Sequence, residues 1–235
     1  MTTHTVVSPE QWTLARRALL AREKEFMKLR DELSQARREL PWERVAANYA
    51  FEGASGRETL ASLFGPHNQL IVYHFMFAPE WEAGCKSCSF WADNFNGITA
   101  HLAQRDVAFA AISRAPQAKL AAFAQRLGWQ FKWLSSADCD FNYDYGVSFR
   151  AADVEQGTAR YNDVPYSGSM TDLPGLSVFY KDTDGALFRT YSTYARGLDP
   201  INAAYQLLDL VPKGRDEAGL AHTMEWVKLR DLYTA

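Results

Sequence analysis

The sequence predicts an α/β domain in which a mixed β-sheet is flanked by helices, with a long helical arm at the N-terminus. Two dense runs of β-branched and aromatic residues, 69–77 and 106–113, are each followed by a helical pattern, which is typical of buried parallel strands. A third run, 176–180, is separated from 186–191 by the turn 182–185, which predicts an antiparallel hairpin. Strands that alternate with helices and end in a hairpin form a mixed sheet covered by helices.

The composition is that of a folded protein with one large domain. The chain has 235 residues, of which 47% are hydrophobic and 23% charged, and its formal net charge is −3. A disordered chain would have lower hydrophobicity and a higher net charge. We expect a helical arm over 1–40 and a domain with a C-terminal extension over 41–235. The near-neutral charge argues against a nucleic-acid partner, which would need clustered Lys and Arg.

The sequence gives no indication of a membrane or secretory segment. Its longest strongly apolar run, 70–78, contains His74 and is far shorter than the roughly 20 residues of a membrane-spanning helix. The N-terminus lacks a basic region followed by an apolar stretch, so we expect no signal peptide. Three cysteines are too few for a disulfide scaffold. These observations predict a cytoplasmic protein with reduced thiols and no membrane partner.

The first forty residues predict one long helix. Ser8 can cap it, Pro9 suits its first position, and Gln11 can complete a capping box. We expect the helix to run to residue 40 and to stop before the proline that follows. Its apolar residues alternate at spacings of three and four, which is a heptad pattern: Trp12, Ala15, Leu19, Phe26, Leu29, Leu33, Ala36 and Leu40.

This apolar stripe predicts a packing partner. Burying such a side chain is worth roughly 1.5–3 kcal/mol. A helix of about 30 residues is about 45 Å long, whereas a compact domain of this size is roughly 35 Å across. We therefore expect a homodimer in which part of the stripe contacts the other subunit, with a helix lying across its own domain as the alternative. Arg22 fills one slot of the stripe and weakens a continuous coiled coil, because burying a lone charge is costly.

The domain that follows contains several further predicted elements. A connecting segment over 41–68 has a short helix at 59–64, and a single helix follows the cysteine pair with Trp91, Phe95, Ile98 and Leu102 on one face. A helix over 116–127 ends at a glycine. The region 135–172 is polar and aromatic and predicts irregular structure with short strands. A helix over 199–210 and a last one around 224–229 complete the chain.

Cys85 and Cys88 form the only closely spaced cysteine pair, in the sequence CKSC. A zinc site would need two further ligands, and the third cysteine and the five histidines are scattered, so we expect no metal. The pair follows a buried strand and opens a helix, where free backbone N–H groups and the helix dipole favour a thiolate. A thiolate is the attacking species in disulfide exchange, and the two-residue spacer lets the second sulfur reach the first. Lys86 adds a positive charge beside the pair, unless its side chain is simply solvated.

The order of strand, CxxC helix, strand, helix, hairpin preceded by proline, and helix matches the thioredoxin fold. More narrowly, the chain resembles the bacterial thioredoxin-like family DUF899, whose members are often labelled predicted dithiol-disulfide oxidoreductases. The stretches that carry this resemblance are LLAREKEFMKLRDELSQARRELPW (19–42), CKSCSFWADNFNG (85–97), DFNYDYGV (140–147), PGLSVFY (174–180) and LDLVPKGRDE (208–217). Two positions depart from the expected pattern: Lys86 stands where proline is expected to be frequent, and Cys139 where no regular cysteine is expected.

The resemblance implies thiol–disulfide exchange in which Cys85 attacks a substrate disulfide and Cys88 resolves the mixed disulfide. The substrate is a protein or small-molecule disulfide or thiol, and no metal or organic cofactor is required. Thioredoxin-like proteins carry a cis-proline before the strand that faces the CxxC; a trans proline is the alternative, because cis bonds make up only about 5–6% of X–Pro links. The residues that we expect to contact substrate are Trp81, Lys86, Ser87 and Pro174, the last being the candidate cis-proline.

Two other functions compete with this hypothesis. A peroxiredoxin-like peroxidase would carry Thr or Ser three residues before the reactive cysteine, in a Pro-x-x-x-Thr-x-x-Cys pattern. Glu82 stands there instead, and Pro79 lies six rather than seven residues before Cys85. A non-catalytic binding or assembly protein is favoured by the helical arm and by the aromatic segment 141–145. Cys139 is either a passive thiol or, if it lies beside Cys88, the receiver of a disulfide.

Overall fold

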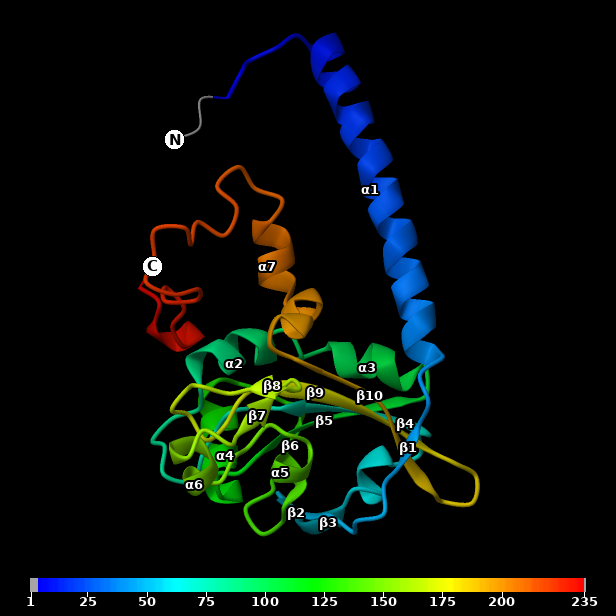
Figure 1. The fold of residues 1–235 in the computed structure, drawn as a ribbon, viewed down its shortest axis with the longest axis vertical. Helices are drawn as coiled ribbons and strands as arrows, with labels where there is room; N and C mark the ends of the chain where they lie inside the picture. Colours follow the sequence, from blue (N-terminus) through cyan, green and yellow to red (C-terminus); the bar gives the residue numbers. More distant parts are fainter. Residues whose placement is uncertain (1–3, 235) are drawn as a thin grey trace. The chain divides into compact units, whose positions relative to one another are not determined.

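The computed structural model describes residues 4–234, and the chain divides into two units, Met1–Pro41 and Trp42–Ala235. Figure 1 shows the first unit as one long helix and the second as a sheet with helices around it. None of the helices in the described part of the chain is both long and apolar enough to cross a bilayer.

The first unit consists of helix α1 (Pro9–Arg38), which begins as the sequence predicts. The Ser8 hydroxyl accepts from the Gln11 backbone N–H at 3.3 Å, and the Gln11 side chain accepts from the Ser8 N–H at 3.1 Å. These two bonds form the predicted capping box. The helix ends at Arg38, two residues before the predicted end, with Glu39 as its C-cap.

The apolar stripe of α1 is uncovered within its own unit. Trp12, Phe26 and Leu29 are 60%, 63% and 62% exposed. The 30 residues of the helix correspond to about 45 Å of length. The stripe is therefore an exposed apolar row along the helix.

The second unit is built on an eight-stranded sheet with the strand order β1-β10-β9-β4-β5-β6-β2-β3. The central strands β4 (Gln69–His74), β5 (Val107–Ser113) and β6 (Lys132–Ser135) are parallel. On the other side of β4, the hairpin of β9 (Gly175–Lys181) and β10 (Leu187–Tyr194) runs antiparallel. The remaining strands are β1 (Glu43–Arg44), β2 (Ala50–Gly53) and β3 (Gly56–Thr59) in this sheet, and β7 (Arg160–Tyr161) and β8 (Val164–Pro165) in a separate ribbon. This topology, with the CxxC sequence after β4, is the mixed thioredoxin-like sheet that the sequence predicts.

The central strands are buried on both faces, as their continuous apolar composition predicts. Tyr73 and Ala111 belong to a core that also contains Trp91 and Phe123, and we call this side the α2 face. The opposite side, the α5 face, has its own core, which includes Leu70, Val72, Ile112, Phe141 and Phe179. Because successive strand residues point to opposite sides, β4 contributes to both cores.

The helices of the second unit are short. They are α2 (Lys86–Ala92), α3 (Ile98–Ala103), α4 (Gln117–Arg126), α5 (Phe141–Asp144), α6 (Ala151–Glu155) and α7 (Ala203–Leu208), with 3₁₀ segments η1 (Ser62–Phe64), η2 (Ala195–Ile201) and η3 (Arg230–Leu232). The prediction of a single helix after the cysteine pair is wrong, because the helix is interrupted between α2 and α3. The Asn94 amide donates to the carbonyls of Phe90 and Trp91 at 2.9 and 3.0 Å, and Gly97 adopts a φ of 87°.

Three other segments differ from the sequence prediction. The connecting segment 41–68 contains β1 and the hairpin β2–β3, which extend the sheet at both edges. The helix predicted over 199–210 is η2 followed by α7, with Pro200 inside η2. The helix considered around 224–229 is absent from the described chain, since Met224 has a φ of 64° that no α-helix tolerates.

Candidate functional site

The cysteine pair lies where the chain leaves β4 and enters α2. The Cys85 backbone N–H donates to the Met76 carbonyl at 3.1 Å, which holds the loop against the strand. Gly84 packs closely there: a Cβ atom in its place would lie 2.8 Å from a Phe75 ring carbon and 3.0 Å from a Phe123 ring carbon. Only glycine therefore allows the loop to bring Cys85 down onto the aromatic core of the α2 face.

Cys85 is the N-cap of α2 and is half-buried, whereas Cys88 is 2% exposed in the first turn. Both thiols are free. The Cys88 backbone N–H donates to Cys85 Sγ across 3.5 Å, and the Ser89 hydroxyl donates to the Cys85 carbonyl at 2.9 Å. The sulfur of Cys85 thus occupies the place that a capping oxygen usually fills.

The two thiols have opposite acidities. A hydrogen bond from the Cys88 thiol, aided by the backbone N–H groups of Cys88 and Ser87, lowers the pKa of Cys85 to about 7 against the opposing effect of burial. Burial raises the pKa of Cys88, and the hydrogen bond to Cys85 and the charge of its thiolate raise it further. At neutral pH, Cys85 is therefore about half thiolate and Cys88 stays protonated.

Tyr73 lies beside the buried sulfur. It is on β4, 1% exposed, and its hydroxyl and the Met76 backbone form hydrogen bonds to Cys88 that partly oppose the rise in that thiol's pKa. Burial raises the pKa of Tyr73 well above its usual range, so its hydroxyl remains a donor. Tyr73 was not among the sequence-predicted site residues, because a tyrosine in a buried strand is ordinarily a core residue.

A cavity of about 480 Å³ opens beside the two cysteines. Among the predicted substrate-contacting residues, Lys86, Ser87 and Pro174 line it together with Cys85 and Cys88. Trp81 lies outside the described lining and packs instead against the core of the α2 face. The Lys119 ammonium donates to the carbonyls of Pro79 and Trp81 at 2.8 and 2.9 Å, which fixes the loop in that position.

Pro174 reaches the site in a different conformation from the one expected. No cis peptide bond occurs within residues 4–234, so the Leu173–Pro174 bond is trans. Trans is the favoured form of an X–Pro bond by about 0.5–1 kcal/mol. The Tyr161 hydroxyl donates to the Pro174 carbonyl at 2.6 Å, and β9 begins at the next residue.

Cys139 is not a partner for Cys88. It packs against the core of the α5 face, whereas Cys88 belongs to the core of the α2 face. Cys139 lines a separate polar cavity of about 330 Å³ with Arg114 and Arg150. Burial raises its pKa. The hypothesis that Cys139 receives a disulfide from Cys88 is therefore wrong, and the passive thiol is the remaining interpretation.

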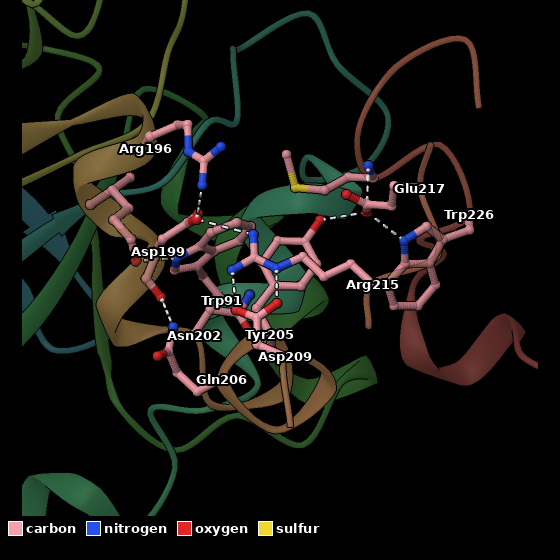
Figure 2. A network of polar contacts seen from close by, with 12 residues as sticks. Trp91, Arg196, Asp199, Asn202, Tyr205, Gln206, Asp209, Arg215, Glu217 and Trp226 are labelled. Carbon is pink, nitrogen blue, oxygen red and sulfur yellow. Dashed lines mark hydrogen bonds and ion pairs between the residues drawn. The ribbon is translucent and has the colours of Figure 1, made fainter. Parts of the chain in front are cut away.

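The sequence patterns do not predict the contribution of the C-terminal region to the site. Arg215, Glu217 and Met224 line the cavity from a segment that follows α7. Figure 2 shows how the side chains of Arg215 and Glu217 join a polar network with residues of η2 and α7. The only sequence signal was the polar turn 213–217, whose charges fit a surface turn equally well. Within residues 4–234, no group of three or more His, Cys, Asp or Glu side chains is arranged to hold a metal ion.

The sheet, the position of the CxxC pair at the start of α2 and the cavity beside it define the protein as thioredoxin-like. The model of the DUF899 family, described as bacterial proteins of unknown function, matches residues 1–233, and the chain belongs to this family. A comparison with curated proteins found no match.

Solved structures show a distant similarity. A peroxidoxin BcpB from Mycobacterium tuberculosis is 17% identical, with a TM-score of 0.45 over 71% of this chain and 96% of that one. A peroxiredoxin Q from Xanthomonas campestris is 16% identical, with a TM-score of 0.45 over 70% and 95%. A putative thiol:disulfide interchange protein DsbE from Chlorobium tepidum is 15% identical, with a TM-score of 0.42 over 72% and 95%. These similarities are too distant to indicate an activity. An activity therefore has to be inferred from the chemistry of the site.

Proposed function

We propose that this protein is a dithiol–disulfide oxidoreductase whose reactive couple is Cys85 and Cys88. The observation that carries this proposal is the asymmetry of the pair: Cys85 faces a cavity with its pKa lowered to about 7, and Cys88 lies buried behind it with a raised pKa. An accessible thiolate beside a protonated thiol is what attack followed by resolution requires.

The reaction proceeds in two exchanges. The Cys85 thiolate attacks one sulfur of a substrate disulfide R–S–S–R′, so that a Cys85–S–S–R bond forms and R′S⁻ leaves. Cys88 then loses its proton and attacks Cys85 Sγ, so that the Cys85–Cys88 disulfide forms and RS⁻ leaves. The protein dithiol is oxidised by two electrons and the substrate is reduced to two thiols. An external thiol or dithiol reverses these steps and restores the reduced protein.

The ionisation of Cys85 affects the pKa of Cys88, and this coupling favours attack by Cys88 only in the second step. The charge of the Cys85 thiolate is one of the causes that keep Cys88 protonated. Once Cys85 is held in a mixed disulfide, that charge is gone, and this contribution to the raised pKa of Cys88 disappears. Cys88 therefore becomes easier to ionise at the step in which it must attack.

A redox titration of the full-length protein tests this function. The protein is equilibrated in mixtures of oxidised and reduced dithiothreitol, quenched with acid, unfolded, alkylated, and analysed by mass spectrometry. We expect a single two-electron transition in which Cys85 and Cys88 lose their two hydrogens together, while Cys139 is alkylated at every potential. A pair that stays alkylatable at every potential, or whose two cysteines label slowly and equally in the folded protein, would instead support a non-catalytic binding protein.

We also propose that the exposed stripe of α1 packs on a second copy of the chain. Light scattering at micromolar concentration is expected to give the mass of a dimer. Phe26→Glu, on the stripe, is expected to produce a monomer, because the new charge would have to be buried at the interface. Met27→Glu is the matched control, since Met27 is 47% exposed and lies off the stripe. A monomeric wild-type protein would contradict this proposal.

A further inference from the structure

The cavity beside Cys85 is a pocket of small-molecule size. Its volume of about 480 Å³ lies within the roughly 300–1,000 Å³ typical of ligand sites. Most of its surface is apolar. The apolar side chains that line it include Tyr73, Met76, Trp91, Leu198, Tyr205 and Met224. A ligand that enters this pocket would meet the reactive sulfur among aromatic rings and methionines.

The pocket exists because the C-terminal part of the chain stands over the CxxC pair. We call residues 195–226 the C-terminal wall. It contributes Leu198, Tyr205 and Met224 to the lining, while the opposite side comes from β4, α2 and Pro174. The cysteines therefore do not lie on an open surface: a substrate has to fit between the wall and the sheet.

The C-terminal wall is fastened to α2, the helix that carries the cysteines. The Trp91 indole N–H donates to the Leu198 carbonyl at 2.8 Å, and Lys86 donates to the Glu225 carbonyl at 2.8 Å. The centroid of the Phe90 ring lies 5.1 Å from that of the Tyr205 ring and 5.5 Å from that of the Trp226 ring, and both pairs pack edge to face. These contacts fix the distance between the wall and the reactive sulfur.

Polar contacts also hold the wall together internally (Figure 2). Arg215 donates twice to Asp209 at 2.8 Å and once to Asp199 at 3.0 Å, and its guanidinium lies 3.9 Å from the centre of the Tyr205 ring. This bidentate pair gives the turn a defined geometry.

Glu217 is the second centre of the network. Its carboxylate accepts from the Tyr205 hydroxyl at 2.7 Å, the Trp226 indole at 2.7 Å and the Met224 backbone N–H at 3.0 Å. Two further charged side chains border the pocket, and each has a partner in the wall: Lys86 donates to the Glu225 carbonyl and Arg196 to Asp199 at 3.0 Å. Arg215, Glu217 and Asp199 already have protein partners, so the pocket offers a ligand mainly apolar contact.

We propose that the pocket selects small disulfides with an uncharged, apolar body, and that the C-terminal wall excludes disulfides of folded proteins. This inference rests on the proposed function and specifies its substrate class. One half of the disulfide lies among the apolar side chains, and the Cys85 thiolate attacks the sulfur of that half. The products are two small thiols and the Cys85–Cys88 disulfide, with the same balance of electrons as above.

Single-turnover oxidation of the reduced protein tests this selectivity. The probes are 4,4′-dithiodipyridine as the uncharged aromatic disulfide, oxidised glutathione as a charged one, and insulin as a folded protein. Each rate is divided by the rate of the same probe with free N-acetylcysteine at equal thiolate concentration. We expect the normalised rate for the aromatic probe to exceed the other two by ~10-fold or more, the discrimination that an apolar pocket provides, and to saturate with probe concentration.

A pair of neighbouring substitutions assigns the effect to the pocket. Thr223 and His222 are both exposed residues of the C-terminal wall, but only Thr223 lines the cavity. Thr223→Trp is expected to lower the rate with the aromatic probe by ~10-fold and to leave alkylation by iodoacetamide unchanged. His222→Trp is expected to change neither rate.

The outcomes separate this inference from the proposed function. If all three probes form the Cys85–Cys88 disulfide with equal normalised rates, or if Thr223→Trp behaves like His222→Trp, the substrate class is wrong and the oxidoreductase function stands. If no probe forms that disulfide, both fail together.

Discussion

The Cys85 thiol on the α2 face of the central sheet and the buried ionisable groups on the α5 face have pKa values shifted in opposite senses relative to their charged forms. On the α2 face, Cys85 is surrounded by hydrogen-bond donors, and its pKa falls to about 7. On the α5 face, burial raises the pKa of Cys139 and lowers that of His74 to about 3, so both groups are kept neutral. The difference shows that burial by itself suppresses charge, and that donors aimed at the sulfur are needed to reverse it.

His74 and Tyr73 are neighbours on β4 and illustrate the same contrast. Tyr73 points to the α2 face and donates toward Cys88. His74 points to the α5 face, where its ring stacks on Phe141 and its Nε2 atom lies 2.9 Å from the Ser177 hydroxyl. Both side chains are buried, but only Tyr73 contacts the reactive pair.

The largest expected effect comes from removing the sulfur atoms on the two faces in turn. Cys85→Ser is expected to abolish disulfide reduction, because the attacking thiolate is gone. Cys88→Ser is expected to trap a mixed disulfide on Cys85, detectable by mass spectrometry as an added substrate half. Cys139→Ser, on the other face, is expected to retain the wild-type rate. Loss of activity in Cys139→Ser, or its survival in Cys85→Ser, would reverse the assignment of the two faces.

The second prediction concerns His74 and acid stability. The folded pKa of about 3 lies below the usual 6.5, so below pH 6.5 the unfolded chain binds a proton that the folded chain does not. Stability is fully present above pH 6.5 and falls by about 1.4 kcal/mol per pH unit as the pH drops toward the folded value. His74→Phe removes this proton while the Ser177 hydroxyl keeps its bond to Ser192 at 3.0 Å.

Urea unfolding of wild type and His74→Phe at pH 7 and pH 5 measures the effect. We expect the wild type to lose more stability than the variant over this range, and the difference in loss to be about 1–2 kcal/mol. Equal losses in the two proteins would show that His74 titrates normally and that the α5 face does not suppress its charge.

The third prediction concerns the close packing that sets Cys85 in place. Gly84→Ala puts a Cβ atom 2.8 Å from the Phe75 ring, so the loop or the ring must move. We expect a loss of about 1–3 kcal/mol in unfolding free energy and slower alkylation of Cys85, because the sulfur shifts away from its donors. Gly146→Ala is a control for stability alone, since Gly146 has a φ of 63° but a Cβ atom added there would have no heavy atom within 4 Å. Unchanged Cys85 reactivity in Gly84→Ala would contradict the positioning role.

The smallest expected effect belongs to the Ser87 side chain, which is the last of the hydrogen bonds that lower the pKa of Cys85. Ser87→Ala is expected to raise that pKa slightly, seen as a shift of the alkylation profile to higher pH. Ser89→Ala is the comparison, because its hydroxyl donates to the Cys85 carbonyl and not to the sulfur. A larger shift in Ser89→Ala than in Ser87→Ala would mean that helix geometry, not direct bonding, controls the thiolate.

The parts of the site that sequence patterns predict are those encoded locally. The runs 69–77 and 106–113 are mostly apolar, and such runs form strands in the middle of a sheet. The CKSC sequence follows the first run after the loop 78–84, which places the thiols at a helix start. The C-terminal wall could not be predicted, because its polar contacts join Asp199 to Arg215 and Lys86 to Glu225 across 16 and 139 residues. The break between α2 and α3 escaped prediction because apolar spacing continues through Asn94 and Gly97.

The claim that hydrogen-bond donors make Cys85 a thiolate at neutral pH is tested by the pH dependence of alkylation at all three cysteines in one sample. Native protein is treated with iodoacetamide at pH values from 5 to 10, and the label on each cysteine is measured by mass spectrometry after digestion. We expect a half-maximal rate for Cys85 near pH 7, whereas Cys88 and Cys139, whose pKa values are raised by burial, should react only at higher pH than an ordinary thiol. A Cys85 profile that rises only near pH 9, together with that of Cys139, would show that the donors of the α2 face do not create a thiolate and would contradict the account.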